Sequence, residues 1–303
     1  MIWKKKGLVY CPDGHSEWAK HSALTPTPLL IDDDTIRVFV SMRDLRGIGR
    51  IGYVDVDADN PLRITDISEE PVLDIGIPGT FDDNGVILGD IANRDGKLWM
   101  YYVGFQLVEK VKFLAFTGLA ISRDGGVGFE RFGNAPILDR NEEGLYFRAI
   151  HSVLPERGTW KAWCGVGSGW AYIDDKPYPR YNIRCYESQD GVHFPETGAL
   201  CIDNTTEEYR IGRPRVYKTR NGYQMFYTKG TLNHDYLPGY AESRDGVSWV
   251  RKDHDVGISL SASGWDSKHL CYPALITVHD RTYMFYNGND MGKSGFGCAV
   301  LEQ

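Results

Sequence analysis

The sequence lacks the features of exported, membrane-spanning and nucleic-acid-binding proteins. No apolar segment that could form the core of a signal peptide follows Lys4, Lys5 and Lys6. No apolar run approaches the ~18 residues that a membrane-spanning helix needs. The net charge of −7 leaves no basic excess for a nucleic acid or a membrane surface. These absences predict a soluble, cytoplasmic protein without nucleic-acid or membrane partners.

The cysteines and histidines give no metal-binding pattern. The six cysteines do not show the paired spacing of zinc ligands; they stand at Cys11, Cys164, Cys185, Cys201, Cys271 and Cys298. In a chain without an export signal we expect buried thiols rather than disulfides. His15, His21, His151 and His269 are equally dispersed. The sequence therefore predicts no cofactor and identifies no metal ligands, and it leaves a metal ion in the axial channel open.

What the sequence does contain is an aromatic pattern that repeats along its whole length. Short strands centred on Val40, Tyr102, Trp163, Tyr227 and Tyr286 follow one another at intervals of 62, 61, 64 and 59 residues. Each copy predicts about four strands separated by turn residues. Five copies indicate an all-β protein, a five-bladed β-propeller with four-stranded blades. Because the repeat runs without a linker, we expect one domain over residues 1–303.

Three copies also carry a Ser-x-Asp-Gly turn, at Ser122–Gly125, Ser188–Gly191 and Ser243–Gly246. Asp and Gly both favour tight turns, so we interpret these aspartates as structural. If the strands run up and down, the turns share one face. The starts of the first strands and the longer, more varied loops then share the other face. Functional sites tend to lie on irregular loops of a rigid scaffold, which places the expected site on this second face.

The first and last segments of the chain complement each other. Residues 2–10 resemble the strands that follow the Asp-Gly turns, such as Ser248–Lys252, whereas the last copy stops after its third strand near Leu301. We therefore expect the N-terminal strand to complete the last blade. Closing the ring in this way would remove the exposed edges of an open sheet.

Three features together carry a family resemblance: the Ser-x-Asp-Gly turns, the Tyr-Met-Phe-Tyr strand at Tyr283–Tyr286, and the terminal Asn-Gly-Asn and Gly-Phe-Gly motifs. With them the chain resembles the five-bladed propeller glycosidases and glycoside phosphorylases of glycoside hydrolase families 32, 43, 68 and 130. The resemblance implies acids at the starts of the innermost strands. Of the acid triad of families 43 and 32, only Asp90 is present. Thr25 and Pro26 occupy the first position, and the segment 148–151 occupies the third.

A glycosyl-transfer site needs an acid for the leaving oxygen and an anion acting on the anomeric carbon. The candidate carboxyl pair is Asp83 and Asp266, with Asp90 and Asp44 as supporting anions. Other polar residues expected to bind substrate on the same face are Asp82, Asn84, His151, His269 and Tyr272. Alternatively, each acid caps a strand or pairs with a nearby arginine.

Arginines at the same level are the second unusual feature. Arg43, Arg148 and Arg213 belong to the first, third and fourth copies. The planar fork of Arg suits phosphate and carboxylate, so these residues indicate an anionic ligand: phosphate, a sugar phosphate, a nucleotide-linked sugar or an acidic sugar. Alternatively, they neutralise the aspartates in ion pairs.

These patterns lead to two functional hypotheses. The first is a carbohydrate-active enzyme that acts on a glycosidic bond of an anionic saccharide, by inverting hydrolysis or by phosphorolysis. The second is a carbohydrate-binding propeller without catalysis. The missing triad members favour the second hypothesis, whereas Asp90 and the acidic loop at 82–83 favour the first. The sequence leaves the sugar, the linkage and the oligomeric state open.

Overall fold

The computed structural model describes residues 1–156, 158–233 and 236–302 as an almost entirely β-stranded chain. Its hydrogen-bonded strands fall into five antiparallel groups of four. Within the described residues, no helix is long and apolar enough to cross a bilayer. The short helical segments are η1 (Asp253–Asp255) and α1 (Asn289–Gly292).

The strands of each group follow one another in the chain, with one exception in the fifth group. The first group is β2 (His21–Asp32), β3 (Thr35–Arg43), β4 (Gly49–Asp57) and β5 (Ile64–Ile67). The second is β6 (Val86–Arg94), β7 (Lys97–Gln106), β8 (Leu114–Ser122) and β9 (Glu130–Arg131). The third is β10 (Phe147–Glu156), β11 (Thr159–Ile173), β12 (Lys176–Ser188) and β13 (Ala199–Ile202). The fourth is β14 (Glu208–Thr219), β15 (Gly222–Thr231), β16 (Tyr236–Ser243) and β17 (Trp249–Arg251). The fifth is β18 (Cys271–Val278), β19 (Arg281–Asn287), β20 (Phe296–Leu301) and β1 (Trp3–Tyr10).

The N-terminal strand occupies the position that the sequence predicts for it. β1 pairs antiparallel with β20, with Trp3 opposite Leu301 and Tyr10 opposite Phe296. The Trp3 side chain is buried and meets Phe226 of the fourth group edge-on, at 6.3 Å between ring centroids. β1 therefore covers the edge of β20 and also contacts the neighbouring group.

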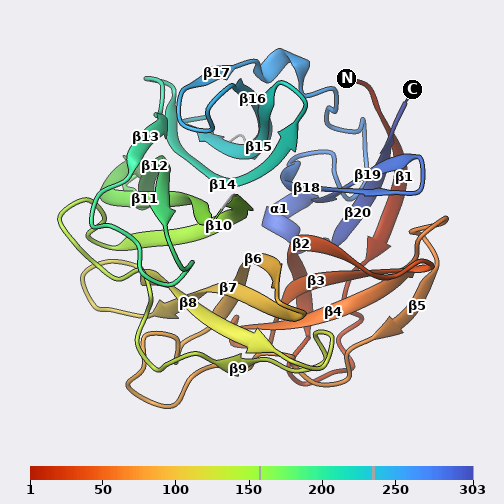
Figure 1. The fold of residues 1–303 in the computed structure, drawn as a ribbon, viewed down its shortest axis with the longest axis horizontal. Coiled ribbons are helices and arrows are strands. Elements are labelled where there is room, and N and C mark those ends of the chain that lie inside the picture. The colour runs from red at the N-terminus through yellow and green to blue at the C-terminus, as the bar shows by residue number, and fades with distance from the viewer. Residues whose placement is uncertain (157, 234–235, 303) are drawn as a thin grey trace.

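Figure 1 shows the five groups arranged around a common centre, with the first strand of each group innermost. The hydrophobic core lies between neighbouring groups. Five clusters of buried side chains join groups 1 and 5, 1 and 2, 2 and 3, 3 and 4, and 4 and 5. Strands between two such clusters are buried on both faces, as β3 is from Ile36 to Met42, whereas the outermost β1 alternates. This arrangement leaves the centre of the ring for polar side chains.

The Ser-x-Asp-Gly turns close one side of the ring, which we call the turn face. In each turn the serine hydroxyl contacts the aspartate and accepts a hydrogen bond from a glycine N–H, as Ser188 does from Gly191 at 2.9 Å. The turn also docks on the preceding group, because its glycine carbonyl accepts a hydrogen bond from that group. Tyr101 donates to the Gly191 carbonyl at 2.9 Å, and Trp163 donates to the Gly246 carbonyl at 2.8 Å. The expectation that these aspartates form turns is met.

The opposite side, which we call the axial face, carries the starts of the five innermost strands. Each of these strands has a register shift near its start, between Leu24 and Thr27, Leu88 and Asp90, Ile150 and Ser152, Gly212 and Arg215, and Cys271 and Ala274. At three shifts a residue before a proline has left-handed backbone: Thr25 (φ 58°), Arg213 (φ 55°) and Tyr272 (φ 56°). Extra residues of this kind redirect side chains and recur next to active sites.

Candidate functional site

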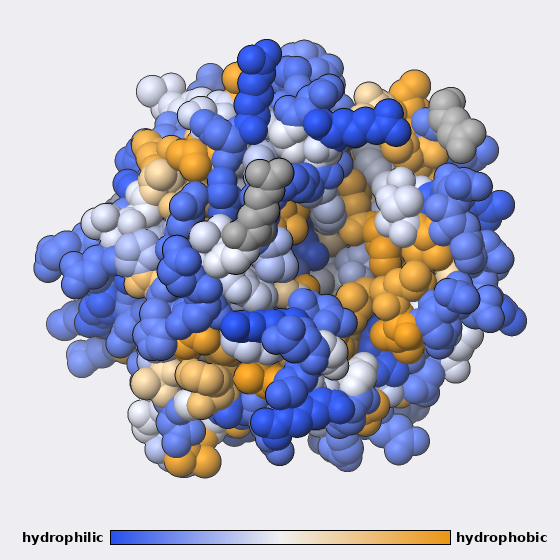
Figure 2. Space-filling view, viewed as in Figure 1, coloured by the Kyte–Doolittle hydropathy of each residue, from blue (hydrophilic) through white to orange (hydrophobic). Residues whose placement is uncertain are grey.

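The centre of the axial face is the candidate site. Figure 2 shows a hollow near the centre of this face. The side chains that the strand irregularities bring there come from different groups: His151 from β10, Arg210 and Arg213 from β14, and Tyr272 from β18. The loop with α1 also lies at the centre of the ring in Figure 1.

Asp90 and Arg215 form a buried ion pair that links three innermost strands. An Nη of Arg215 donates to Asp90 Oδ1, and Asp90 Oδ2 accepts a hydrogen bond from the Val153 N–H at 2.8 Å. Burial lowers the pKa of Arg215, but Asp90 more than offsets this and raises it. Asp90 thus joins β6, β10 and β14 through bonds within the protein, and its role as a supporting anion remains a prediction.

His151 is buried next to this ion pair and is held in the neutral state. Burial, followed by the positive charges of Arg213 and Arg215, keeps the pKa of His151 well below its usual value. Arg213 Nη1 lies 3.2 Å from His151 Nδ1. Since a guanidinium can only donate, Nδ1 is the acceptor and the ring hydrogen is on Nε2. His151 therefore orients Arg213 through this hydrogen bond and, being neutral, adds no positive charge beside it.

Arg43, Arg210 and Arg213 form what we call the axial arginine cluster. Among the described residues, none of the three has an ion pair with a carboxylate. Each keeps a buried guanidinium nitrogen without a hydrogen-bond partner there: Arg43 Nε, Arg210 Nε and Arg213 Nη2. Tyr272 is an electrostatic neighbour of all three. Buried charges are normally paired, so this cluster is suited to hold an anion.

The tyrosines around the cluster provide further donors. Arg210 lies between two rings, with Cζ 4.9 Å from the Tyr209 centroid and 4.3 Å from the Tyr236 centroid. The Tyr236 hydroxyl donates to the Tyr272 hydroxyl at 3.1 Å. Burial raises the pKa of both tyrosines, so both stay protonated at neutral pH. The Tyr272 hydrogen is then available for an anion on the arginines.

Arg213 itself remains a cation despite its burial. Burial lowers its pKa to about 10, and one of its nitrogens donates to the Leu88 carbonyl. A pKa of about 10 still leaves the guanidinium protonated at pH 7. Of the predicted site residues, Arg213 contacts His151 and also the ring of Tyr272, at 5.4 Å from Cζ to the centroid, and Tyr272 is an electrostatic neighbour of Arg43.

Arg148 departs from the role expected of it, because both of its terminal nitrogens bind main-chain carbonyls, although its buried Nε has no hydrogen-bond partner among the described residues. It donates to the main-chain carbonyls of Asp139 at 2.7 Å and Glu196 at 3.0 Å. Its Cζ also lies 5.3 Å from the ring centroid of Tyr186 on β12. Arg148 thus joins the loops that precede β10 and β13.

Asp266 and Asp82 are a second correction, because both carboxylates bind outer strands of their own groups. Asp266 Oδ2 accepts hydrogen bonds from Tyr286 at 3.0 Å and from Lys5 of β1 at 2.6 Å. Asp82 Oδ2 accepts them from Tyr102 at 3.1 Å and from Arg131 of β9 at 2.8 Å. In both groups the preceding aromatic residue stacks on the same tyrosine, so this is one structural motif used twice.

Asp44 is also committed to local structure. Its Oδ1 accepts hydrogen bonds from the N–H groups of Arg46 at 2.9 Å and Ile48 at 3.0 Å, and its Oδ2 pairs with Arg50 at 3.1 Å. Burial raises the pKa of Asp44, but these hydrogen bonds outweigh burial and lower it. Asp44 therefore fixes the loop between β3 and β4 and is not free to act as a base.

The remaining predicted residues lie in loops of the same face. Asp83 is half-buried and its Oδ2 accepts a hydrogen bond from the Gly79 N–H at 2.8 Å. Asn84 Oδ1 accepts one from the Leu107 N–H at 2.9 Å. His269 Nδ1 accepts one from the Asp290 N–H at 2.9 Å. The carboxylates of the predicted pair thus have different partners: Asp83 binds the loop at Gly79, and Asp266 binds Lys5 of β1. Of these two residues, Asp83 has no ion pair among the described residues.

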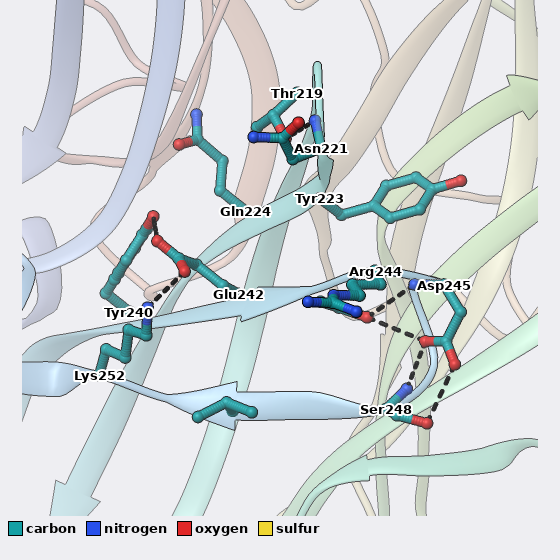
Figure 3. Close-up of a pocket in the computed structure, with 12 residues that line it drawn as sticks. Thr219, Asn221, Tyr223, Gln224, Tyr240, Glu242, Arg244, Asp245, Ser248 and Lys252 are labelled. Carbon is teal, nitrogen blue, oxygen red and sulfur yellow. Dashed lines mark hydrogen bonds and ion pairs between the residues drawn. The ribbon is translucent and has the colours of Figure 1, made fainter.

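Arg210 and Tyr236 are two further residues of the site. The sequence offers a signal for both, because Arg210 stands three positions before Arg213 among the basic residues of this face, and Tyr236 is an aromatic residue beside a long loop that could stack on a sugar ring. The structure also has a surface pocket away from the axial site. Figure 3 shows it on β15–β17, where Glu242 pairs with Lys252 and accepts a hydrogen bond from Tyr240 at 2.9 Å.

Comparisons with solved structures define the class of fold. Over 99% of this chain and 93% of the other, the TM-score is 0.71 and the identity 14% with a structure titled "The GH130 family of mannoside phosphorylases contains glycoside hydrolases that target beta-1,2 mannosidic linkages in Candida mannan". A glycosyl hydrolase from Bacteroides ovatus gives 0.72 at 14% identity, covering 100% and 93%. A thermostable family-43 glycoside hydrolase gives 0.66 at 16% identity, covering 94% and 90%. The chain therefore has the propeller-type fold of these glycoside hydrolases, as the resemblance in sequence implies.

Sequence comparisons place the chain in a family. It is 33% identical over 305 residues to a Mycobacterium tuberculosis protein named "Uncharacterized protein Rv1502", with all of both chains covered. A second relative, "Uncharacterized protein MT1551" from another strain of the same species, has the same identity and coverage. The chain belongs to the family of these proteins. No family model matches it.

Proposed function

We propose that this protein is a carbohydrate-active enzyme that acts on a glycosidic bond of an anionic saccharide at the centre of the axial face. The observation that carries the proposal is the axial arginine cluster: three arginines without a carboxylate partner among the described residues, each with a buried guanidinium nitrogen that lacks a hydrogen-bond partner there. An anion of the substrate, or inorganic phosphate as a second substrate, would supply the missing negative charge. The five strand groups would be the five blades of one propeller domain over residues 1–303.

Phosphorolysis explains the carboxylates better than hydrolysis does. Inverting hydrolysis needs two carboxyl groups, one as acid and one as base for water. Asp44, Asp90 and Asp266 are all held by partners within the protein. With phosphate on Arg43, Arg210 and Arg213, phosphate itself would attack the anomeric carbon, and a single acid would suffice.

The second candidate is a carbohydrate-binding propeller without catalysis. The observation that favours it is the same commitment of Asp44, Asp82 and Asp266 to structural bonds. Such a protein would still bind an anionic saccharide on the arginines but would leave it unchanged. The anion prediction is therefore common to both candidates, and turnover separates them.

One assay tests the proposal. The protein is incubated with oligosaccharides, sugar phosphates and nucleotide sugars, with and without inorganic phosphate, and the products are separated by mass. Formation of a sugar phosphate that depends on added phosphate identifies a phosphorylase, and phosphate-independent cleavage identifies a hydrolase. Anion binding without any product would favour the binding protein. If phosphate, sulfate and the sugar phosphates all fail to bind, the axial site is not an anion site.

A further inference from the structure

At the turn face, neighbouring groups are held together by turns that dock on the group before them. Each docked turn presents a main-chain carbonyl to a side chain of the preceding group. The donors and acceptors are Arg37 and Gly125 at 3.4 Å, Tyr101 and Gly191 at 2.9 Å, Trp163 and Gly246 at 2.8 Å, and Tyr283 and Asp59 at 3.1 Å. Four of the five boundaries between groups therefore share one docking interaction.

The boundary between the fourth and fifth groups has no such turn among the described residues. The third and fourth strands of the fifth group are β20 and β1, which are not consecutive in the chain, so no turn connects them. A surface pocket of about 720 Å³ lies at the turn-face end of the fourth group (Figure 3). We call this pocket, which includes Asn221, Gln224, Glu242 and Val250, the docking slot. All its lining residues belong to the fourth group, so no described part of the fifth group fills it.

Gln224 of β15 occupies the position from which the third group holds its turn. In the third group Lys161 lies opposite Glu187, one residue before the turn serine, and donates to the Asp245 carbonyl at 2.7 Å. In the fourth group Gln224 lies opposite Glu242, again one residue before a turn serine. By strand register, Gln224 is therefore the docking residue of the fourth group.

Phe226, two residues further along β15, shows which way Gln224 points. Alternate residues of a strand share a face, so both side chains lie on the same side of β15. Phe226 packs in the core between the fourth and fifth groups and meets Trp3 edge-on. Gln224 therefore faces the boundary with the fifth group. Trp3 covers Phe226 there, whereas the docking slot leaves Gln224 open.

The docking slot suits a main-chain segment better than an ion. Gln224 is half-buried, and its amide has no hydrogen-bond partner among the described residues. The Glu242 carboxylate is neutralised by Lys252 and accepts a hydrogen bond from Tyr240 at 2.9 Å. Val250 lies opposite Glu242 on β17 and is 63% exposed. The slot thus offers an amide donor beside an uncovered apolar side chain and a carboxylate that already has partners.

We propose that the docking slot binds a tight turn of another polypeptide, whose main-chain carbonyl accepts a hydrogen bond from Gln224. The three Ser-x-Asp-Gly turns of this chain are already docked on their own neighbours, so a second copy could supply one of them only by opening its own ring. The partner is therefore a different protein that presents a turn of the Asp-Gly type. Because the slot lies on the turn face, this partner leaves the axial arginine cluster accessible.

A cyclic peptide with the sequence of residues 241–251, which contains the turn of the fourth group, is the probe. The labelled peptide is titrated with the full chain, and fluorescence anisotropy measures its affinity. Gln224→Ala should weaken binding about three- to tenfold, because one hydrogen bond is lost. Gln189→Ala is the matched control and should leave the affinity unchanged, since Gln189 is an exposed glutamine of another turn. Arg213→Ala should also leave it unchanged, which keeps this test separate from the proposed anion site.

A circular permutant tests the same fit within one chain. Trp3 lies opposite Leu301 as Trp249 lies opposite Ser243, so a linker with the sequence of residues 244–248 can join Leu301 to Trp3. New termini in the exposed loop at Gly133 and Leu301→Ser are common to this permutant and to its control, which has a Gly-Ser linker of equal length. The turn linker should raise the melting temperature by about 2–4 °C over the control and abolish peptide binding.

Three outcomes would overturn the proposal. If the peptide does not bind the full chain, the slot takes no turn from a partner, whatever the permutants show. If the peptide binds equally well to Gln224→Ala, it binds elsewhere. If oligosaccharides bind in place of the peptide and lose affinity in Gln224→Ala, the slot is a saccharide site. Peptide binding that depends on Gln224 and is lost in the turn-linked permutant supports the proposal.

Discussion

The turn face and the axial face treat charge in opposite ways. On the turn face each aspartate of the Ser-x-Asp-Gly turns is neutralised by nearby donors, as Asp245 is by the Val247 and Ser248 N–H groups at 2.8 and 2.7 Å. On the axial face Arg43, Arg210 and Arg213 keep buried nitrogens without partners. On the same repeating scaffold, the turn aspartates are therefore bonded within the protein, whereas these three arginines keep nitrogens that have no partner among the described residues.

The difference shows which interactions the fold needs. The turns dock each group on its neighbour, so their hydrogen bonds contribute to folding. Arg43, Arg210 and Arg213 have no carboxylate partner among the described residues, so their desolvation opposes folding and is offset only in part by contacts such as that of Arg213 with the Leu88 carbonyl. Left-handed backbone at Arg213 and Tyr272 adds local strain at the same place. We therefore expect substitutions in the docking contacts between groups to change the free energy of unfolding, and substitutions in the axial arginine cluster to change ligand binding.

Loss of β1 should have the largest effect, on stability alone. Trp3 and Val9 are buried, and Lys5 pairs with Asp266. Trp3→Ala should destabilise the protein by about 3–5 kcal/mol, and deletion of residues 1–10 by more. Urea-induced unfolding measures the loss. Ile2→Ala is the control, because Ile2 is 64% exposed and its truncation should cost less than about 0.5 kcal/mol. An unchanged melting temperature after the deletion would contradict closure of the fifth group by β1.

Arg213→Ala should have the next largest effect, on ligand binding. At a hundredfold excess over its dissociation constant, an anion stabilises the wild type by about 2.7 kcal/mol. Without Arg213 the cluster loses one of its three cations and most of that stabilisation should vanish. Thermal unfolding with and without phosphate or sulfate measures it. Arg123→Ala, on the turn face, should keep the full shift, since Arg123 is exposed. Equal losses in both variants would mean nonspecific anion binding.

Sequence alone predicts the scaffold well because its signals are local and repeated. The spacing of the aromatic strands, the Asp-Gly turns and the strand-like Trp3–Tyr10 segment each specify nearby backbone geometry, and the structure contains them. Position on the axial face was also predictable for Arg213 and His151, since both lie at the start of a first strand.

The direction of a side chain in a loop was not predictable. Asp266 and Asp82 stand in loops before first strands, yet their carboxylates turn to Lys5 and Arg131 of outer strands, which are far away in sequence. Arg148 likewise turns to loop carbonyls. Each direction depends on partners that only the folded chain brings close. The place of Arg210 between two tyrosine rings was not predictable for the same reason, because Tyr209 is its neighbour in sequence whereas Tyr236 belongs to another strand.

The third effect should be of intermediate size: the buried His151 should make the free energy of unfolding depend on pH. The pKa of His151 is lowered in the folded state, so below pH ~6.5 the unfolded chain binds a proton that the folded chain does not. Stability should therefore fall as the pH drops, by up to about 1.4 kcal/mol per pH unit. His151→Gln should remove this slope between pH 6.5 and 5. A slope that is unchanged in the variant would assign it to other groups.

The smallest effect should come from a substitution in one Ser-x-Asp-Gly turn of the turn face. Asp190 accepts hydrogen bonds from His193 and from the Val192 N–H at 2.9 Å, and these bonds lower its pKa. A carboxylate with a lowered pKa stabilises the fold above its unfolded value of about 3.9 and loses that effect as the pH falls. Because the side chain is partly exposed, Asp190→Ala should cost only about 0.5–1.5 kcal/mol at pH 7. Urea unfolding should show this difference at pH 7 and a smaller one near pH 2, because the contribution is lost progressively as the pH falls below about 3.9. The sulfate affinity of Asp190→Ala should equal that of the wild type; a weakened affinity would show that the two faces are energetically coupled, against the division drawn between them.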